Sequence, residues 1–161
     1  MKTNKKYKLT DEYITLGDKK IYRIEALKDF SNVKKGDKGG FIESEKNLSH
    51  NGDCWVFGDA RVWGNAAVCG NAEVWGNAAV WGNAAVCGTA KVVNNADYIV
   101  FKNWWSSGRY FTWTRSNNMW RVGCFYGTGE ELIAKAYKDS ELSGREYERV
   151  VKYVESILKE D

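Results

Sequence analysis

A six-residue repeat from Gly52 to Asp97 constrains this chain more than any other feature of its sequence. It reads GDCWVF, GDARVW, GNAAVC, GNAEVW, GNAAVW, GNAAVC and GTAKVV, and it decays in NNADYI. A fixed short period indicates an architecture in which each unit stacks on its neighbours. Each hexad suits one short strand and one corner, so three hexads would close one coil. The repeat therefore predicts a left-handed parallel β-helix.

Two sets of repeat residues should point into this coil. β-Branched residues pack well on a pleated surface, and small residues fit where the coil narrows at its corners. The first set is Val56, Val62, Val68, Val74, Val80, Val86 and Val92; the second is Ala60, Ala66, Ala72, Ala78, Ala84, Ala90 and Ala96. The corners themselves need positive φ, which glycine adopts without steric cost. The corner glycines are Gly58, Gly64, Gly70, Gly76 and Gly82.

Residues three hexads apart should lie directly above one another, about 4.8 Å apart. The predicted pairs are Trp63 over Trp81, Phe57 over Trp75, Cys69 over Cys87, Glu73 over Lys91 as a surface charge pair, and Ala67 over Ala85 on a bare face. An exposed apolar face beside aromatic corners is typical of an interface, and open strand edges need a cover. We expect a homo-oligomer, a trimer or higher, with Trp63, Ala67, Trp81 and Ala85 at the interface. The alternative is that the flanking segments cover these surfaces within one chain.

Cysteine usage and charge limit the remaining classes of protein. The four cysteines have no CxxC spacing, so neither a metal site nor a cofactor is expected. Cys69 and Cys87 could approach across one coil, but two reduced thiols are the preferred interpretation for a cytoplasmic protein. The formal net charge of +3 is too mild for a general nucleic-acid coat. Met1 to Lys8 has no signal-peptide pattern and no run is long enough to span a membrane, which predicts a cytoplasmic protein.

The flanking segments divide the chain into three predicted domains, residues 1–49, 50–100 and 101–161. The first should be a strand and hairpin cap, because Tyr22, Ile24 and Ala26 alternate and a glycine-rich turn precedes Phe41. The last should be a small ββαα module. Its hairpin would have strands at 110–115 and 120–125 with a turn at 116–118. Capping boxes at Thr128 with Glu131 and at Ser143 with Glu146 predict its two helices. The fold class predicted overall is mainly β with α.

Residues 101–127 form the strongest candidate for a binding surface. This segment holds nine aromatic residues and four cations but no acid. Aromatic faces stack on nucleobases, and arginine binds phosphate in bidentate geometry. The loop before Thr128 also leads into a helix N-terminus, which favours anions. The predicted ligand-binding residues are Trp104, Trp105, Arg109, Tyr110, Trp113, Arg115, Trp120, Arg121, Phe125, Tyr126 and Thr128. The alternative is that the tryptophans form the core under the helices and that Thr128 is only a helix cap.

The sequence also resembles a known group of proteins. DFSNVKKGDKGGFIESEKNLSHNGDCWVFGDARVWGNA is similar to the opening of a family of phage, prophage and bacterial hexapeptide-repeat proteins, described as transferases or polymer-forming proteins. The resemblance covers roughly residues 29–92 and rests on the D-F-x-x-V-K-x-G-x-x-G-G stretch and the G-D-C-W start of the repeat. TWTRSNNMWRVGCFYGTGEEL resembles the C-terminal module of such phage proteins, with its G-C-F-x-G-T motif. The resemblance implies a fold and a phage origin.

Two functions from different classes remain open at this stage. One is a non-enzymatic oligomeric phage protein that sequesters a small nucleotide signal of host defence, such as a cyclic dinucleotide or an ADP-ribose derivative. The other is a structural or protein-interaction module without a small-molecule ligand. A hexapeptide acyltransferase is less favoured, because His50 is the only histidine and lacks a companion acid at a catalytic spacing. A single-stranded nucleic-acid binder is also less favoured, and a membrane partner is not expected.

Overall fold

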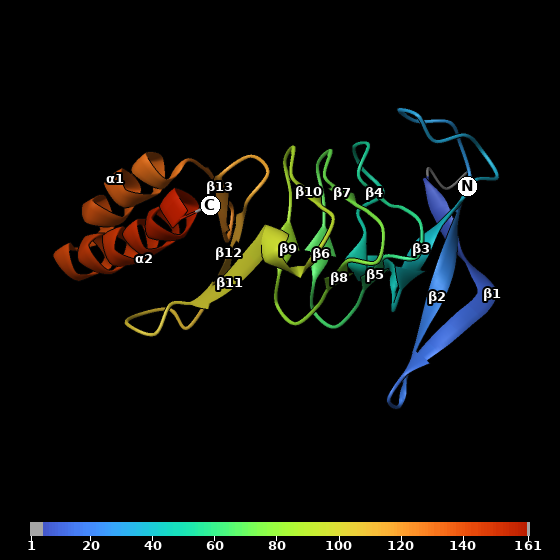
Figure 1. The fold of residues 1–161 in the computed structure, drawn as a ribbon, viewed down its shortest axis with the longest axis horizontal. Coiled ribbons are helices and arrows are strands. Elements are labelled where there is room, and N and C mark those ends of the chain that lie inside the picture. The colour runs from blue at the N-terminus through green and yellow to red at the C-terminus, as the bar shows by residue number, and fades with distance from the viewer. Residues whose placement is uncertain (1–4, 161) are drawn as a thin grey trace.

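A computed structural model of the protein describes residues 5–160 as an elongated molecule built in three stages along its long axis (Figure 1). The N-terminal hairpin lies at one end, the hexad segment (residues 52–97) occupies the middle, and two helices lie at the other end. The prediction that residues 1–8 are not a signal peptide falls partly on residues 1–4, which lie outside the described residues.

The N-terminal stage is a long hairpin that joins the hexad segment through one strand. β1 (Tyr7–Leu16) pairs antiparallel with β2 (Lys19–Ala26), which pairs antiparallel with β3 (Lys38–Ile42). β3 then pairs in parallel with the hexad strand β5 (Arg61–Val62), through Phe41 with Arg61 and Ile42 with Val62. A short 3₁₀ helix, η1 (Glu45–Asn47), follows. The N-terminal stage is therefore a hairpin that β3 joins to the hexad segment.

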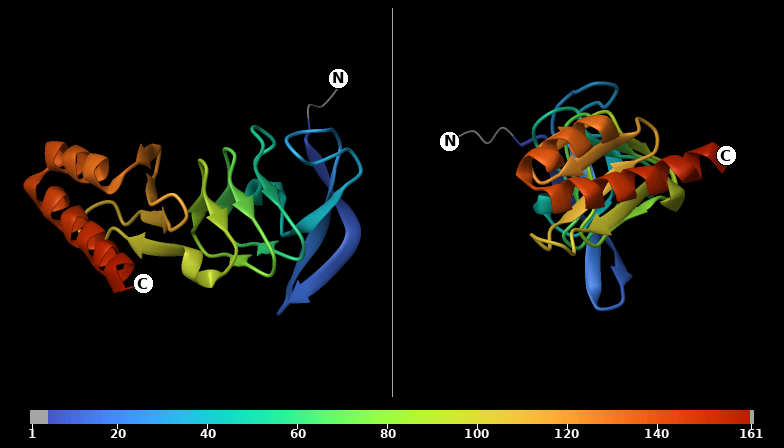
Figure 2. Two further views of the ribbon diagram at one scale, coloured as in Figure 1. Left: turned by 45° about the horizontal axis from the view of Figure 1, so that its top comes forward. Right: turned by 90° about the vertical axis from the view of Figure 1, so that its left-hand side faces the viewer.

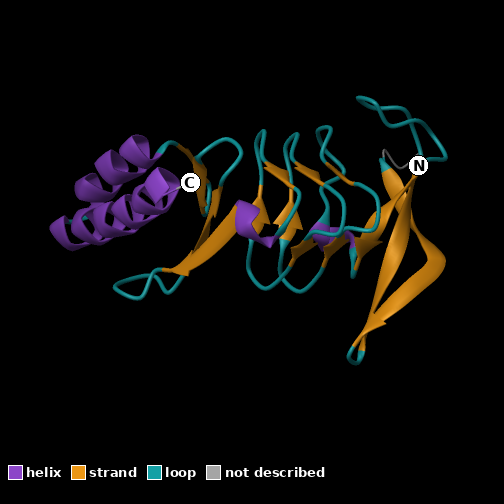
Figure 3. Cartoon of the chain, viewed as in Figure 1, coloured by secondary structure: helices purple, strands orange, loops and turns teal. Residues whose placement is uncertain are grey.

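The hexad segment consists of two-residue strands separated by turns (Figure 3). The strands are β4 (Trp55–Val56), β5 (Arg61–Val62), β6 (Ala67–Val68), β7 (Glu73–Val74), β8 (Ala79–Val80), β9 (Ala85–Val86) and β10 (Lys91–Val92). They pair in parallel at the predicted spacing, in the ladders β5–β8, β6–β9 and β4–β7–β10. The seven inward valines are fully buried, and the five corner glycines have positive φ. Among the inward alanines, Ala96 is the exception and lies exposed, because η2 (Asn95–Asp97) has replaced the repeat there.

The predicted fold class is wrong, because the structure is not a regular parallel left-handed β-helix. Its strands are short and lie in separate sheets, since each corner leaves only two residues of every hexad for pairing. The largest sheet is mixed, with the order β1-β2-β3-β5-β8 and an antiparallel hairpin on one side. A second, antiparallel sheet and two helices complete the chain. The fold is better described as several small parallel, mixed and antiparallel sheets with two helices.

The corners of the hexad segment confirm most of the predicted pairs. Trp63 and Trp81 are parallel with ring centroids 5.8 Å apart, and the corresponding distance for Phe57 and Trp75 is 3.8 Å. Cys69 and Cys87 form a disulfide, so the preferred interpretation of two reduced thiols is wrong. The predicted charge pair is replaced by another contact. Glu73 lies opposite Lys91 in the ladder but accepts a hydrogen bond from the Trp75 indole at 2.7 Å.

The C-terminal stage contains two more strands than the predicted ββαα module. β11 (Tyr98–Lys102), β12 (Tyr110–Thr114), β13 (Met119–Val122) and β14 (Phe125–Gly127) form an antiparallel sheet in sequence order, called the terminal sheet below. The hairpin of β12 and β13 was predicted. The outer strands were missed, because β11 directly follows the decayed repeat and β14 has only three residues.

Both faces of the terminal sheet are covered (Figure 1). Tyr98 and Val100 pack against the core of the hexad segment, whereas Ile99 and Phe101 pack against the helices. Side chains alternate along a strand, so one sheet can close both cores. The sheet and the turn after β12 also give one hydrogen bond to the last strand of each ladder. Tyr98 Oη donates to Ala79 O at 2.8 Å, Thr112 Oγ1 accepts from Ala85 N at 2.9 Å, and Ser116 Oγ accepts from Lys91 N at 2.8 Å.

The two helices cover the outer face of the terminal sheet, in front of the hexad segment when the molecule is viewed from that end (Figure 2). α1 (Gly129–Asp139) begins at the predicted capping box of Thr128 and Glu131. α2 (Glu141–Glu160) begins earlier than predicted. Ser143 therefore lies inside the helix instead of capping it, and Ser140 Oγ accepts a hydrogen bond from Ser143 N at 3.0 Å. α2 has an apolar stripe toward the sheet, in which Tyr147, Val151 and Val154 are buried.

Removal of the corner disulfide tests the stacking of the coils. The variant Cys69→Ser/Cys87→Ser should lower the free energy of unfolding by about 3 kcal/mol, because the bridge closes a loop of about eighteen residues in the unfolded chain. Denaturant unfolding measures this change, with the exposed Cys124→Ser as the control. Titration that finds four free thiols in the unreduced, unfolded protein would contradict the disulfide.

Candidate functional site

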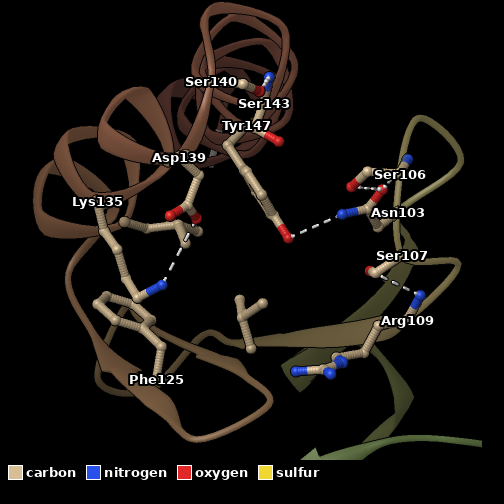
Figure 4. A pocket seen from close by; sticks show the side chains of 13 residues that line it. Asn103, Ser106, Ser107, Arg109, Phe125, Lys135, Asp139, Ser140, Ser143 and Tyr147 are labelled. Atoms are coloured by element: carbon tan, nitrogen blue, oxygen red, sulfur yellow. Dashed lines mark hydrogen bonds and ion pairs between the residues drawn. The ribbon is translucent and has the colours of Figure 1, made fainter.

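The candidate site is a cavity of about 390 Å³ between the terminal sheet, the loop that joins β11 to β12, and the two helices (Figure 4). We call it the helix cavity. Its volume falls within the range of about 300–1,000 Å³ that is usual for small-molecule sites. It is lined by Asn103, Ser106, Ser107, Arg109, Val122, Phe125, Leu132, Lys135, Ala136, Asp139, Ser140, Ser143 and Tyr147.

The loop is held in place by the side chain of Asn103. Its Oδ1 accepts hydrogen bonds from the main-chain N–H groups of Trp105 at 3.2 Å and Ser106 at 2.9 Å, and also from the Ser106 hydroxyl. Asparagine commonly makes such bonds to the main chain two or three residues on. Its Nδ2 donates to Tyr147 Oη at 3.4 Å. Asn103 therefore links the loop to α2 and fixes one wall of the cavity.

The phenol of Tyr147 stands at the centre of the site (Figure 4). The side chain is almost fully buried, and Trp105 packs edge-on against its ring with centroids 4.9 Å apart. Because the oxygen accepts from Asn103, its proton is free to be donated into the cavity. Burial is the main reason that the pKa of Tyr147 is raised above its ordinary value. The group is therefore a hydrogen-bond donor at neutral pH.

Two cations line the cavity from different walls, Lys135 from the helix side and Arg109 from the loop side (Figure 4). Lys135 on α1 lies 3.7 Å from Asp139, so its charge is partly balanced. Arg109 at the end of the loop has its main-chain N–H bonded to Ser107 Oγ at 3.1 Å. Within residues 5–160, its guanidinium makes no hydrogen bond or ion pair. The cavity therefore carries an excess positive charge with Phe125 beside it, and it can hold an anion that also has a flat apolar part.

The structure brings only part of the predicted ligand-binding set to this cavity. Arg109 and Phe125 line it, and Trp105 supports Tyr147. Trp104 is 70% exposed but does not line it. Tyr110 lines a different hollow.

The other predicted residues have structural roles elsewhere in the terminal stage. Trp113 and Trp120 are completely buried under the helices, so their proposed stacking on a ligand is wrong. Arg121 and Tyr126 lie opposite each other on the face of the sheet toward the hexad segment, and the Tyr126 hydroxyl accepts from Asn117. Arg115 Nε donates to Ala96 O at 3.1 Å.

The predicted anion site at Thr128 is also not formed as expected. Thr128 Oγ1 already accepts from Glu131 N at 3.2 Å as the helix cap. The hollow that it lines is bordered by Glu130 and Glu155, whose charge disfavours an anion.

Three residues of the site were not predicted from the sequence: Lys135, Tyr147 and Asn103. Tyr147 could not be told from its apolar stripe, because a helical pattern does not show which stripe residue borders a cavity.

His50, the residue considered for acyl transfer, lies at the far end of the molecule and holds the N-terminal strand. Its ring stacks on Tyr7 with centroids 4.1 Å apart. Nδ1 accepts from Lys6 N at 3.1 Å, and Nε2 lies 2.8 Å from Glu45 Oε1. Both ring nitrogens are engaged in these contacts.

The predicted interface residues differ in exposure. Trp81 is 55% exposed, whereas Trp63, Ala67 and Ala85 are half-buried.

No family model and no curated protein matches the chain, so the resemblance to phage hexapeptide-repeat proteins stays a prediction. Across the described part of the chain, no helix has the length and apolar character needed to span a membrane. The same residues contain no group of three or more His, Cys, Asp or Glu side chains placed to hold a metal ion.

The protonation of Tyr147 gives a direct test of the site's electrostatics. Since burial raises its pKa above the ordinary value of about 10, the folded protein keeps this proton at a pH where the unfolded chain loses it. The stability that this proton contributes is complete below about pH 10 and falls as the pH rises further. Absorbance titration of the wild type minus Tyr147→Phe should show a phenol that ionises above pH 10. A difference curve with its midpoint at or below 10 would contradict the buried donor.

Proposed function

We propose that the chain is a non-enzymatic protein that binds and retains a small phosphorylated nucleotide in the helix cavity. One observation carries the proposal: three donors of different elements converge on a single cavity that contains one carboxylate. The donors are the Arg109 guanidinium, the Lys135 ammonium and the Tyr147 hydroxyl. Such a set suits a phosphate, whose oxygens can accept hydrogen bonds from all three groups. The bonds from the two cations would be strong, because both partners are charged.

The remaining lining suits the rest of a nucleotide. Phe125 offers an aromatic ring against which a base can stack. Ser106 and Ser107 present hydroxyls that suit a ribose. A cavity of about 390 Å³ accommodates one nucleotide unit, which is a mononucleotide, half of a cyclic dinucleotide, or part of an ADP-ribose derivative. In the setting that the phage resemblance suggests, the protein acts in the cytoplasm of the infected bacterium and sequesters a defence signal.

The guanidinium of Arg109 is the best single residue with which to test this proposal. The variant Arg109→Gln should weaken binding of cyclic di-AMP, cyclic di-GMP or ADP-ribose at least tenfold, because it removes the unpaired cation while keeping most of the side-chain volume. Titration calorimetry with each of these three nucleotides measures the effect.

Arg145→Gln is the matched control, since Arg145 is an exposed arginine of α2 that does not line the cavity. It should bind as the wild type does. Equal affinities for Arg109→Gln and wild type would move the site away from the helix cavity. The absence of binding to all three nucleotides would contradict the proposed function for these ligand classes.

A further inference from the structure

The outer edge of β11 is an unpaired strand edge. Asp97 O accepts a hydrogen bond from Arg115 N, and Asn103 N donates one to Arg109 O, both at 2.8 Å. These two bonds show which residues of β11 direct their main-chain groups toward β12. In an antiparallel pair, hydrogen-bonded residues alternate with residues whose main-chain groups point outward. The outward groups of β11 are therefore those of Tyr98, Val100 and Lys102. Within residues 5–160, no main-chain or side-chain group bonds to them.

A hollow of about 500 Å³ runs along this edge, and we call it the edge hollow. Three consecutive residues of β11, Tyr98 to Val100, line it although their side chains alternate between the two faces of the sheet. Tyr98, Val100 and Tyr110 face the hexad segment, so the hollow lies between that segment and the sheet, beside the main chain of β11. Trp81 and Tyr110, which are 55% and 43% exposed, form part of its rim, and no charged side chain lines it.

This edge lacks the features that normally prevent strands from pairing between molecules. Exposed edges are usually blunted by charges, prolines or bulges. The outer strand β1 of the largest sheet has both a bulge between Leu9 and Tyr13 and the charged residues Asp11 and Glu12. β11 reads YIVFK, with no bulge in its pairing and its one charge at the end.

We propose that β11 pairs antiparallel with β11 of a second copy of this chain, around a two-fold axis at Val100. The two terminal sheets then become one continuous sheet. Tyr98 lies opposite Lys102 of the second copy, so each outward N–H meets a carbonyl of the other chain. A two-fold contact needs one self-complementary surface. β11 provides it, because its outward N–H and C=O groups are open and its sequence is extended and uncharged except at Lys102.

The side chains at the rim favour the same occupant. Tyr110 lies beside Lys102 in the register of the sheet, and Trp81 lines the hollow beside Tyr98. Pairing around Val100 brings Lys102 and Tyr110 of one copy to Tyr98 and Trp81 of the other. The ammonium of Lys102 then lies near the aromatic rings of Tyr98 and Trp81 of the other copy. Trp81 thus belongs to a two-fold contact at the sheet edge, instead of an interface over the alanine face.

Two variants test this contact from different sides. Val100→Pro removes an outward N–H from the strand, and proline is tolerated on edge strands. Trp81→Lys places a charge on the uncharged rim at a mostly exposed position. Trp104→Lys is the control, because it replaces an even more exposed tryptophan that does not line the edge hollow. Light scattering after size exclusion gives the mass of each protein, and circular dichroism shows whether each is folded.

The wild type and Trp104→Lys should each have the mass of two chains, and the folded variants Val100→Pro and Trp81→Lys should have the mass of one. Hydrogen exchange adds a residue-level measurement. The amides of Tyr98, Val100 and Lys102 should be protected in the wild type and exchange fast in Trp81→Lys. A monomeric wild type, an assembly that persists in Trp81→Lys, or fast exchange of these amides in the wild type would overturn the proposal. An assembly lost equally in Trp104→Lys would also overturn it.

Discussion

The open ends of three parallel ladders are the constraint on which the rest of this structure depends. A stack of two-residue strands leaves unpaired main-chain groups at its last turn, and buried unpaired groups are costly. Three hydroxyl groups of the terminal sheet and its turn each bond one of these main-chain groups, one for each ladder. They are those of Tyr98, Thr112 and Ser116. The same sheet contributes Val100 and the Tyr98 ring to the end of the valine core.

The position of the helix cavity also follows from the cover over this end of the hexad segment. Alternation along β11 and β12 sends one set of side chains toward the hexad segment and leaves the other set, including Phe111 and Trp113, in need of a cover. The two helices supply it. The loop between these two strands must then pass the end of the helices, where Asn103 ties it to Tyr147. One face of the terminal sheet covers the end of the hexad segment, and the two helices cover the other face. The cavity lies between that second face, the loop and the helices. The strand edge that remains open is a consequence of the same arrangement.

Much of the local structure of the hexad segment could be predicted, because a strict period fixes which residues stack. The register, the buried valines, the corner glycines and the tryptophan pair at Trp63 follow from spacing alone. The fold class could not be predicted in the same way. A repeat describes its own interior, whereas the mixed sheet depends on how β3 joins β5 and on the antiparallel hairpin behind it.

The candidate site could be predicted only in part. Arg109 and Phe125 were found because a cationic aromatic segment is visible in the sequence, and the same pattern wrongly included Trp113 and Trp120. Aromatic content does not distinguish a core from a binding surface, since both use the same residues. Tyr147 was missed because its role depends on a contact with Asn103 across the fold.

Retention of an unchanged nucleotide in the helix cavity is the property that most needs a test. The most direct measurement incubates the purified protein with cyclic di-AMP, cyclic di-GMP and ADP-ribose, removes free ligand, denatures the protein by heat and identifies the released molecule by mass. At least one nucleotide should be recovered intact from the wild type. Release of a chemically altered nucleotide would show an enzyme, and an empty fraction for all three would contradict the claim.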